Sequence, residues 1–215
     1  LSPQEIKSIE KAKQRDKAEK DWYIKLKRGR GWLGTSRSQQ AQKAIAEIKD
    51  PYAIAALADA LASDSRRPVR LLFIEALFNI NSPLADKTLA RHALENPDEE
   101  TRLSCLDYLK KRKNPAVLAY FAARLKNKNN IMVNRAGFAL GKMGDPAAVP
   151  ALINALITVH QKKVTSGSPG QTSAGFDNSG GGLSMGSTTK IYNISVRNPE
   201  VLDALTKLTG GVNFE

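Results

Sequence analysis

The chain has 215 residues, 41% of them apolar, which is enough to bury the core of one domain with extensions. It carries a net charge of +12, which suits anionic partners, and its single cysteine excludes an intramolecular disulfide. No apolar run approaches the roughly 18 residues of a membrane span. We therefore expect a soluble protein, either cytoplasmic or exported after removal of an N-terminal signal, since the chain begins at Leu1 without a visible signal peptide.

Residues 1–37 are predicted to form a charged N-terminal helix followed by a capping arm. Ser2-Pro3 with Glu5 is typical of a capped helix start. The end of this segment mixes basic and aromatic residues, namely Lys25, Lys27, Arg28, Arg30 and Trp32. One interpretation is a nucleic-acid-binding arm, with cations on phosphates and aromatic rings on bases. We favour the other, in which Trp22, Trp32 and Leu33 cover the end of a helical stack.

A repeat follows, marked by prolines at regular spacing. Pro51, Pro83, Pro115 and Pro146 are 32, 32 and 31 residues apart. Each follows Asp, Ser or Asn, and such pairs favour the start of a helix because the side chain caps it and proline lacks an N–H. An aliphatic residue stands six positions before each proline. These patterns predict antiparallel helix pairs, with helices at 38–49, 52–63, 67–80, 84–95, 98–113, 116–127, 131–143 and 147–158.

The segment from Met132 to Leu152 resembles the short HEAT repeat, and more narrowly the phycobilisome-lyase type, while Val69-Arg70 matches the start of the second helix of such a unit. The resemblance covers residues 38–157. It implies an all-α fold: a right-handed α-solenoid of stacked antiparallel helix pairs over residues 38–164. HEAT repeats serve many unrelated roles, so the resemblance is specific for the fold and not for the function.

The C-terminal part changes character. Residues 165–190 are rich in Gly and Ser and are predicted to be a flexible loop between two short strands, which together form a small β-hairpin insertion. Tyr192, Ile194 and Val196 alternate with polar residues, as in a half-buried strand. Residues 191–215 hold the second strand and a last helix. Their ending resembles uncharacterised bacterial HEAT-repeat proteins in which the chain continues, so we expect a truncation at Glu215.

Few residues suggest chemistry. His92 and His160 are the only histidines, and neither belongs to a metal-ligand pattern or to the His-Glu pair of a HEAT-fold hydroxylase. His92 is interpreted as an ordinary, partly exposed residue. Cys105 aligns with Phe73 and Ala136 in the repeat and is predicted to lie in the core. A phosphate-binding loop is rejected because Ser187 stands at its lysine position. We expect no enzymatic activity and no cofactor.

The leading hypothesis is a scaffold that binds a protein or peptide through the concave face, which the second helices of a HEAT stack line. The candidate residues there have mixed charge, which suits a protein better than a phosphate groove: Lys43, Glu47, Glu75, Asn79, Asp107, Lys110, Lys111, Asn134 and Lys142. One alternative is nucleic-acid binding by the basic arm and the basic clusters of residues 110–128. Another, implied only by the repeat type, is an accessory subunit of a lyase-type complex. The oligomeric state is left open.

The cluster Lys110-Lys111-Arg112-Lys113 closes one of the expected helices. Cations are favourable near a helix C-terminus for local reasons. All four side chains are therefore expected to be solvated, and replacing them with glutamine is expected to cost about 1 kcal/mol or less in total.

Overall fold

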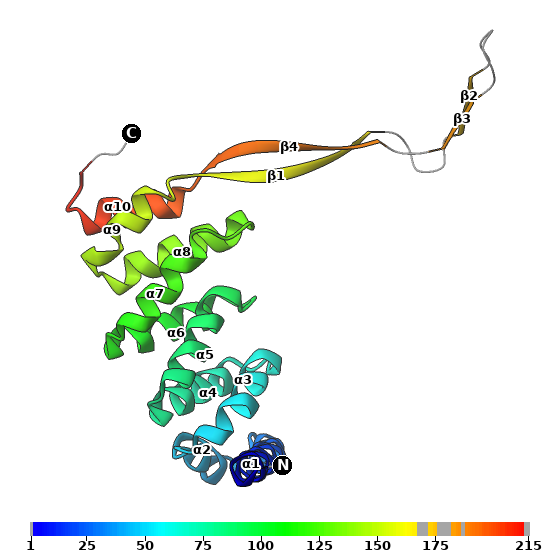
Figure 1. Cartoon of the computed structure of the whole chain (residues 1–215). Helices are drawn as coiled ribbons and strands as arrows, with labels where there is room; N and C mark the ends of the chain where they lie inside the picture. Colours follow the sequence, from blue (N-terminus) through cyan, green and yellow to red (C-terminus); the bar gives the residue numbers. More distant parts are fainter. Residues whose placement is uncertain (1, 167–171, 176–181, 186–187, 213–215) are drawn as a thin grey trace.

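The computed structural model describes residues 2–166, 172–175, 182–185 and 188–212. Helices stack along one direction, and a long β-ribbon projects from the C-terminal end of the stack (Figure 1). The helices, including two short 3-10 segments η1 and η2, are α1 Pro3–Trp32, α2 Ser38–Ala46, η1 Pro51–Ala53, α3 Ile54–Ser63, α4 Arg67–Ile80, α5 Pro83–Glu95, α6 Glu99–Arg112, α7 Pro115–Arg124, α8 Asn130–Met143, η2 Pro146–Ala148, α9 Val149–Ile153 and α10 Pro199–Leu208.

The stack has two layers. The second helices of the units, α2, α4, α6 and α8, contact one another in order, and α10 extends this layer; α3, α5 and α7 contact one another in the other layer. The predicted starts are capped: Asp50, Ser82, Asn114 and Asp145 each accept a hydrogen bond from a backbone N–H just inside the helix that follows. The prediction of stacked helix pairs with a C-terminal hairpin is confirmed.

The second helices also end alike. Asn81, Lys113 and Gly144 stand at equivalent positions after α4, α6 and α8, and all three have left-handed backbone with φ of 50°, 51° and 76°. A left-handed residue at this place closes a helix by returning its N–H to a carbonyl of the last turn. These three units are therefore closed by a left-handed residue before the next proline, whereas α2 ends at Glu47 in right-handed conformation.

The core follows the repeat. Leu77, Leu109 and Leu140 are at most 1% exposed, and the facing positions Leu57, Leu89, Phe121 and Leu152 are completely buried. Cys105 is also completely buried, as its alignment with Phe73 and Ala136 predicts, and burial raises the pKa of its thiol well above the ordinary range. An uncharged, enclosed thiol is not a nucleophile.

The last repeat departs from the predicted helix at 147–158. α9 ends at Ile153, and a strand begins at Ile157. β1 (Ile157–Ser166) pairs antiparallel with β4 (Thr188–Arg197), with Ile157 opposite Arg197 and Ser166 opposite Thr188. Inside the segment expected to be only a loop, β2 (Thr172–Gly175) pairs with β3 (Gly182–Met185). The rest of the Gly/Ser-rich loop, Ser187 and the expected truncation at Glu215 lie outside the described residues.

Large apolar side chains are exposed on both faces of the β1–β4 ribbon. Ile157, Val159 and Ile191 are at least 57% exposed on one face, and Tyr192 and Ile194 are 50% and 38% exposed on the other. The prediction of a half-buried strand is therefore wrong for Tyr192 and Ile194, which belong to a ribbon that projects from the stack (Figure 1). Alternation in a strand indicates two different faces and does not say what lies against them.

Candidate partner-binding surface

Three rows of side chains lie on the solvent side of the second helices at repeat-equivalent positions. All of their members are exposed or half-exposed. We call them together the second-helix face, and in chain order they are Gln39, Leu71, Leu103 and Asn134; Lys43, Glu75, Asp107 and Phe138; and Glu47, Asn79, Lys111 and Lys142. The structure thus brings eight of the nine candidate residues together on one face, while Lys110 is exposed beside Lys111.

Several of these polar groups already have internal partners. Nζ of Lys43 lies 3.9 Å from Oε1 of Glu47, and Nδ2 of Asn79 donates to the carbonyl of Ala46 at 3.1 Å. The ammonium group of Lys111 lies 4.7 Å from the ring centre of Tyr108. An exposed ion pair such as Lys43–Glu47 contributes little to stability. These residues can therefore exchange their contacts for a partner at small cost.

Asn134 has a different role. Its Nδ2 donates to the carbonyl of Asn130 at 3.1 Å and to Oδ1 of Asn198 at 3.0 Å, and its Oδ1 accepts from the backbone N–H of Glu200. Asn198 is 1% exposed and donates onward to the carbonyl of Ala155 at 2.8 Å. Asn134 therefore fastens the start of α10 to α8, and because it also lines the pocket described next, its assignment as a partner-binding residue stays a prediction.

A pocket of about 380 Å³ opens on the second-helix face between α6, α8 and the first turn of α10. Its apolar wall includes Leu103, Ile131 and Phe138, of which Ile131 is 61% and Phe138 37% exposed. Arg102 and Arg135 also line it. Sequence reasoning missed these residues, although Phe138 stands in a row whose other members are charged. An aromatic residue at a position that is charged in the other units could have indicated an exposed apolar site.

The two pocket arginines bind backbone carbonyls in the last turn of α5 and in the loop that follows it. Nη1 of Arg102 donates to the carbonyls of Asn96 and Pro97, both at 3.0 Å, and Nη1 of Arg135 donates to that of Leu94 at 2.7 Å. Partial burial, with the nearby positive charge of Arg102, lowers the pKa of Arg135 from its usual value. Two cations therefore share one wall of the pocket.

A model of the HEAT-repeat family matches residues 37–110 and again residues 87–166. The chain belongs to the HEAT-repeat family. No curated protein sequence matches it. HEAT repeats are typical of protein-interaction scaffolds, and the family is generally non-catalytic.

In the described part of this HEAT-repeat protein, no group of three His, Cys, Asp or Glu side chains could hold a metal ion, and no helix is long and apolar enough to cross a membrane.

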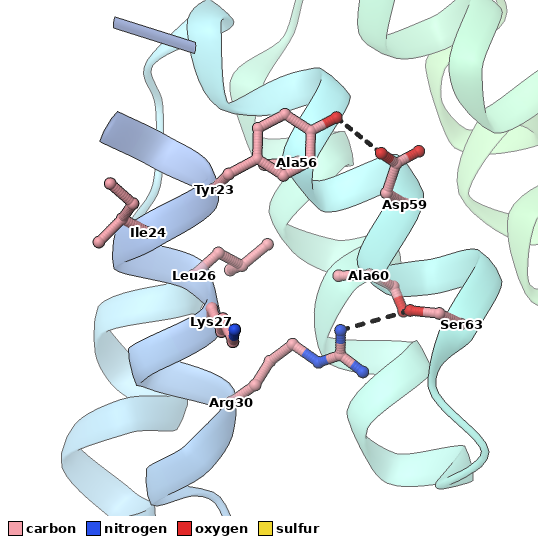
Figure 2. A pocket seen from close by; sticks show the side chains of 9 residues that line it. All are labelled: Tyr23, Ile24, Leu26, Lys27, Arg30, Ala56, Asp59, Ala60 and Ser63. Carbon is pink, nitrogen blue, oxygen red and sulfur yellow. Dashed lines mark hydrogen bonds between the residues drawn. The ribbon is translucent and has the colours of Figure 1, made fainter. Parts of the chain in front are cut away.

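The N-terminal helix of this HEAT-repeat protein is fastened to the first unit by polar contacts. The hydroxyl of Tyr23 donates to Asp59, and Arg30 donates to Ser63 (Figure 2). The Tyr23–Asp59 bond is 2.6 Å long and raises the pKa of Tyr23 to about 12. Nη2 of Arg30 also lies 3.0 Å from Oδ2 of Asp64. Tyr23, Arg30, Asp59 and Ser63 line a cavity of about 370 Å³ between α1 and α3.

These contacts change the interpretation of the basic arm. Arg30 is bound to the buried carboxylate of Asp64, whose pKa its partners Arg66 and Arg30 hold at about 2. Arg30 is therefore not free for phosphate. Lys25, Lys27 and Arg28 are exposed on α1, and Trp32 is 37% exposed with the Arg37 guanidinium 5.4 Å from its ring centre.

Trp22 and Leu33 lie against the repeats instead. Nε1 of Trp22 donates to Asp50 at 2.7 Å, and Leu33 is buried in the core of the stack. Leu26 is buried between them along α1. Trp22, Leu26 and Leu33 thus pack against the first repeat, whereas Trp32, for which the same role is predicted, is exposed.

The basic cluster that closes α6 is also divided. Lys110, Lys111 and Lys113 are exposed, whereas the Arg112 side chain is only 13% exposed. Its Nη1 lies 3.0 Å from Oδ1 of Asp86 and donates to Oδ1 of Asn81 at 2.8 Å, and its Nη2 donates to the carbonyl of Phe78. The expectation that all four side chains are solvated is therefore wrong for Arg112.

The repeat itself contains the signal for this pair. Arg112 stands where the other units have Ile48, Ile80 and Met143, and Asp86 stands where they have Ile54, Leu118 and Val149. Both positions become charged, with opposite sign, in adjacent units. Such a double exchange indicates a buried ion pair that replaces an apolar contact.

His92 is 6% exposed, and the interpretation as a partly exposed residue is wrong. Burial, with a contribution from Arg91, lowers its pKa from 6.5 to about 4. Its Nδ1 lies 3.5 Å from Nδ2 of Asn96, while Nε2 has no hydrogen-bond partner. The folded chain therefore favours the neutral imidazole.

We expect this histidine to make stability fall in acid. As the pH falls from 6.5 toward 4, the histidine of the unfolded chain takes up a proton while the buried His92 of the folded chain stays neutral. The free energy of unfolding should therefore fall over this range, by about 3 kcal/mol for a pKa lowered from 6.5 to about 4. Urea unfolding at pH 7.5, 5.5 and 4.5 measures it. His92→Leu should remove most of the slope, and the His160→Gln control should keep it. An unchanged slope in His92→Leu contradicts the assignment.

Proposed function

We propose that this chain is a non-enzymatic interaction scaffold whose second-helix face binds a protein or peptide. The observation that carries the proposal is the pocket between α6, α8 and α10, where Ile131 and Phe138 expose large apolar side chains to solvent. Exposed apolar side chains that line a concave site are characteristic of binding surfaces.

The charges around the pocket support a protein partner. Glu75 and Asp107 lie on the same face as Lys111 and Lys142, so the face offers no continuous track of positive charge for a phosphate backbone. Nucleic-acid binding is the weaker candidate, because Arg30 and Arg112 are engaged with Asp64 and Asp86. A role as accessory subunit of a lyase-type complex rests only on the resemblance of the repeats to the phycobilisome-lyase type, which specifies no partner.

Site-specific photo-crosslinking tests the proposal. A benzophenone amino acid replaces Phe138 in one variant and Tyr52 in the control. Tyr52 is 41% exposed in the first-helix layer and so matches the 37% exposure of Phe138. In source cells, we expect a crosslinked protein adduct from position 138 that position 52 does not form. Equal labelling from both positions, or adducts to nucleic acid alone, would contradict the proposal.

A further inference from the structure

An arginine recurs at the same position in two adjacent units of the stack and binds the turn that precedes its own helix. Nη1 of Arg70 donates to the carbonyls of Asp64 and Ser65 at 3.3 Å and 2.7 Å. Arg102, which stands 32 residues later, makes the same bonds to the carbonyls of Asn96 and Pro97. The two arginines therefore occupy equivalent places in consecutive units.

Arg70 and Arg102 differ in whether a carboxylate is paired with the guanidinium group. Nη2 of Arg70 lies 3.0 Å from Oδ2 of Asp98, the residue that caps α6. The residue that caps α8 in the next unit is Asn129, which has the same shape and no charge. Among the described residues, no carboxylate lies within 4.0 Å of the guanidinium of Arg102 or of Arg135. The start of α8 therefore lacks the carboxylate that Asp98 provides at the start of α6.

The arginine that has no such carboxylate lines the pocket. Arg102 and Arg135 both line it, and Oδ1 of Asn130 on the same wall is buried without a hydrogen-bond partner. Such an oxygen accepts an N–H bond from an incoming chain, because a buried, unpaired acceptor is costly. Glu99 and Glu200 line the pocket too, in the first turns of α6 and α10, where a negative charge is favoured locally.

We propose that this pocket binds an acidic side chain of a partner peptide, with the carboxylate on Arg102 and Arg135 and a neighbouring bulky apolar side chain on Leu103, Ile131 and Phe138. Arginine binds a carboxylate through two parallel N–H donors, so the pair supplies both charge and direction. The inference rests on the proposed function and specifies the chemistry of the partner for this part of the face.

The test uses a phage-displayed library of random dodecapeptides selected against the purified chain. We expect the enriched peptides to carry Asp or Glu beside Leu, Ile, Phe or Met. One enriched peptide is then synthesised together with its Glu→Gln or Asp→Asn counterpart, and both are titrated by fluorescence anisotropy. Loss of the carboxylate should weaken binding at least about tenfold, the amount expected for a charged hydrogen bond.

Two variants of the chain locate the carboxylate. Arg102→Gln should weaken the acidic peptide about tenfold and leave its amide counterpart unchanged. Because Arg102 also binds the loop at Asn96 and Pro97, its replacement could disturb that loop. Asn129→Asp is a second variant that leaves Arg102 in place. This variant restores the carboxylate of the preceding unit, keeps a good helix cap and should block the acidic peptide with no loss of melting temperature.

The outcomes separate this inference from the proposed function. Enrichment of peptides without acidic residues, failure to enrich any peptide, or an acidic peptide that binds Asn129→Asp as tightly as the unmodified chain would overturn the inference. Crosslinking from position 138 can still succeed in each of these cases, and the scaffold proposal then stands with a partner of other chemistry. Weaker binding of the acidic peptide to both variants supports the pocket assignment.

Discussion

Replacing Arg112 with glutamine should destabilise the stack by about 3–5 kcal/mol, the range for removing one partner of a buried ion pair. The carboxylate of Asp86, 4% exposed, would remain buried without its cation. The carbonyl of Phe78 and the side chain of Asn81 would also lose a donor at the end of α4. A loss of this size is a large part of the stability of an ordinary domain.

Urea unfolding of matched variants measures the effect. Lys110→Gln, Lys111→Gln and Lys113→Gln serve as controls of the same chemistry in the same segment, and each should change stability by only tenths of a kcal/mol because these side chains are exposed. The double variant Asp86→Ile with Arg112→Ile gives this interface the apolar residues of its neighbours and should recover most of the loss. An effect of Arg112→Gln as small as that of the lysines contradicts the assignment.

Replacing Gly137 with valine should displace α10 from the stack. A Cβ at Gly137 would lie 2.7 Å from Cγ2 and 2.9 Å from Cα of Val201, and one at Gly141 would lie 2.9 Å from Cβ of Ala204. The contact with Cα of Val201 involves the backbone, so no rotation of a side chain can relieve it. We expect a loss of about 3 kcal/mol, at the upper end of the range for overpacking, together with release of α10.

Thermal melting and hydrogen exchange over residues 199–208 measure the two effects. Gly31→Ala is the control, because a Cβ there meets nothing within 4 Å and lies inside helix α1. That substitution should leave stability unchanged or raise it by up to about 1 kcal/mol, the difference in helix propensity. Unaltered exchange protection of α10 in Gly137→Val would show that the close approach of the two helices is not required.

The sequence by itself determined the repeat. The spacing of Pro51, Pro83, Pro115 and Pro146, each after a capping side chain, predicts where the first helix of every unit begins. The periodic aliphatic residues predict the buried faces, and Cys105 lies in the core as its alignment requires. These features are readable because capping and helical periodicity act over a few residues and need no knowledge of distant neighbours.

Only the tertiary structure decided which charged side chains are buried and paired, and how exposed the C-terminal ribbon is. Arg112 and Asp86 are 26 residues apart, and their burial depends on how α6 meets α5. The pocket brings together Arg102, Phe138 and Glu200 from three helices. The apolar side chains of the β1–β4 ribbon are exposed because the ribbon projects from the stack. Local patterns show which face of an element is apolar, whereas stacking decides what meets that face and whether a charged group there is paired.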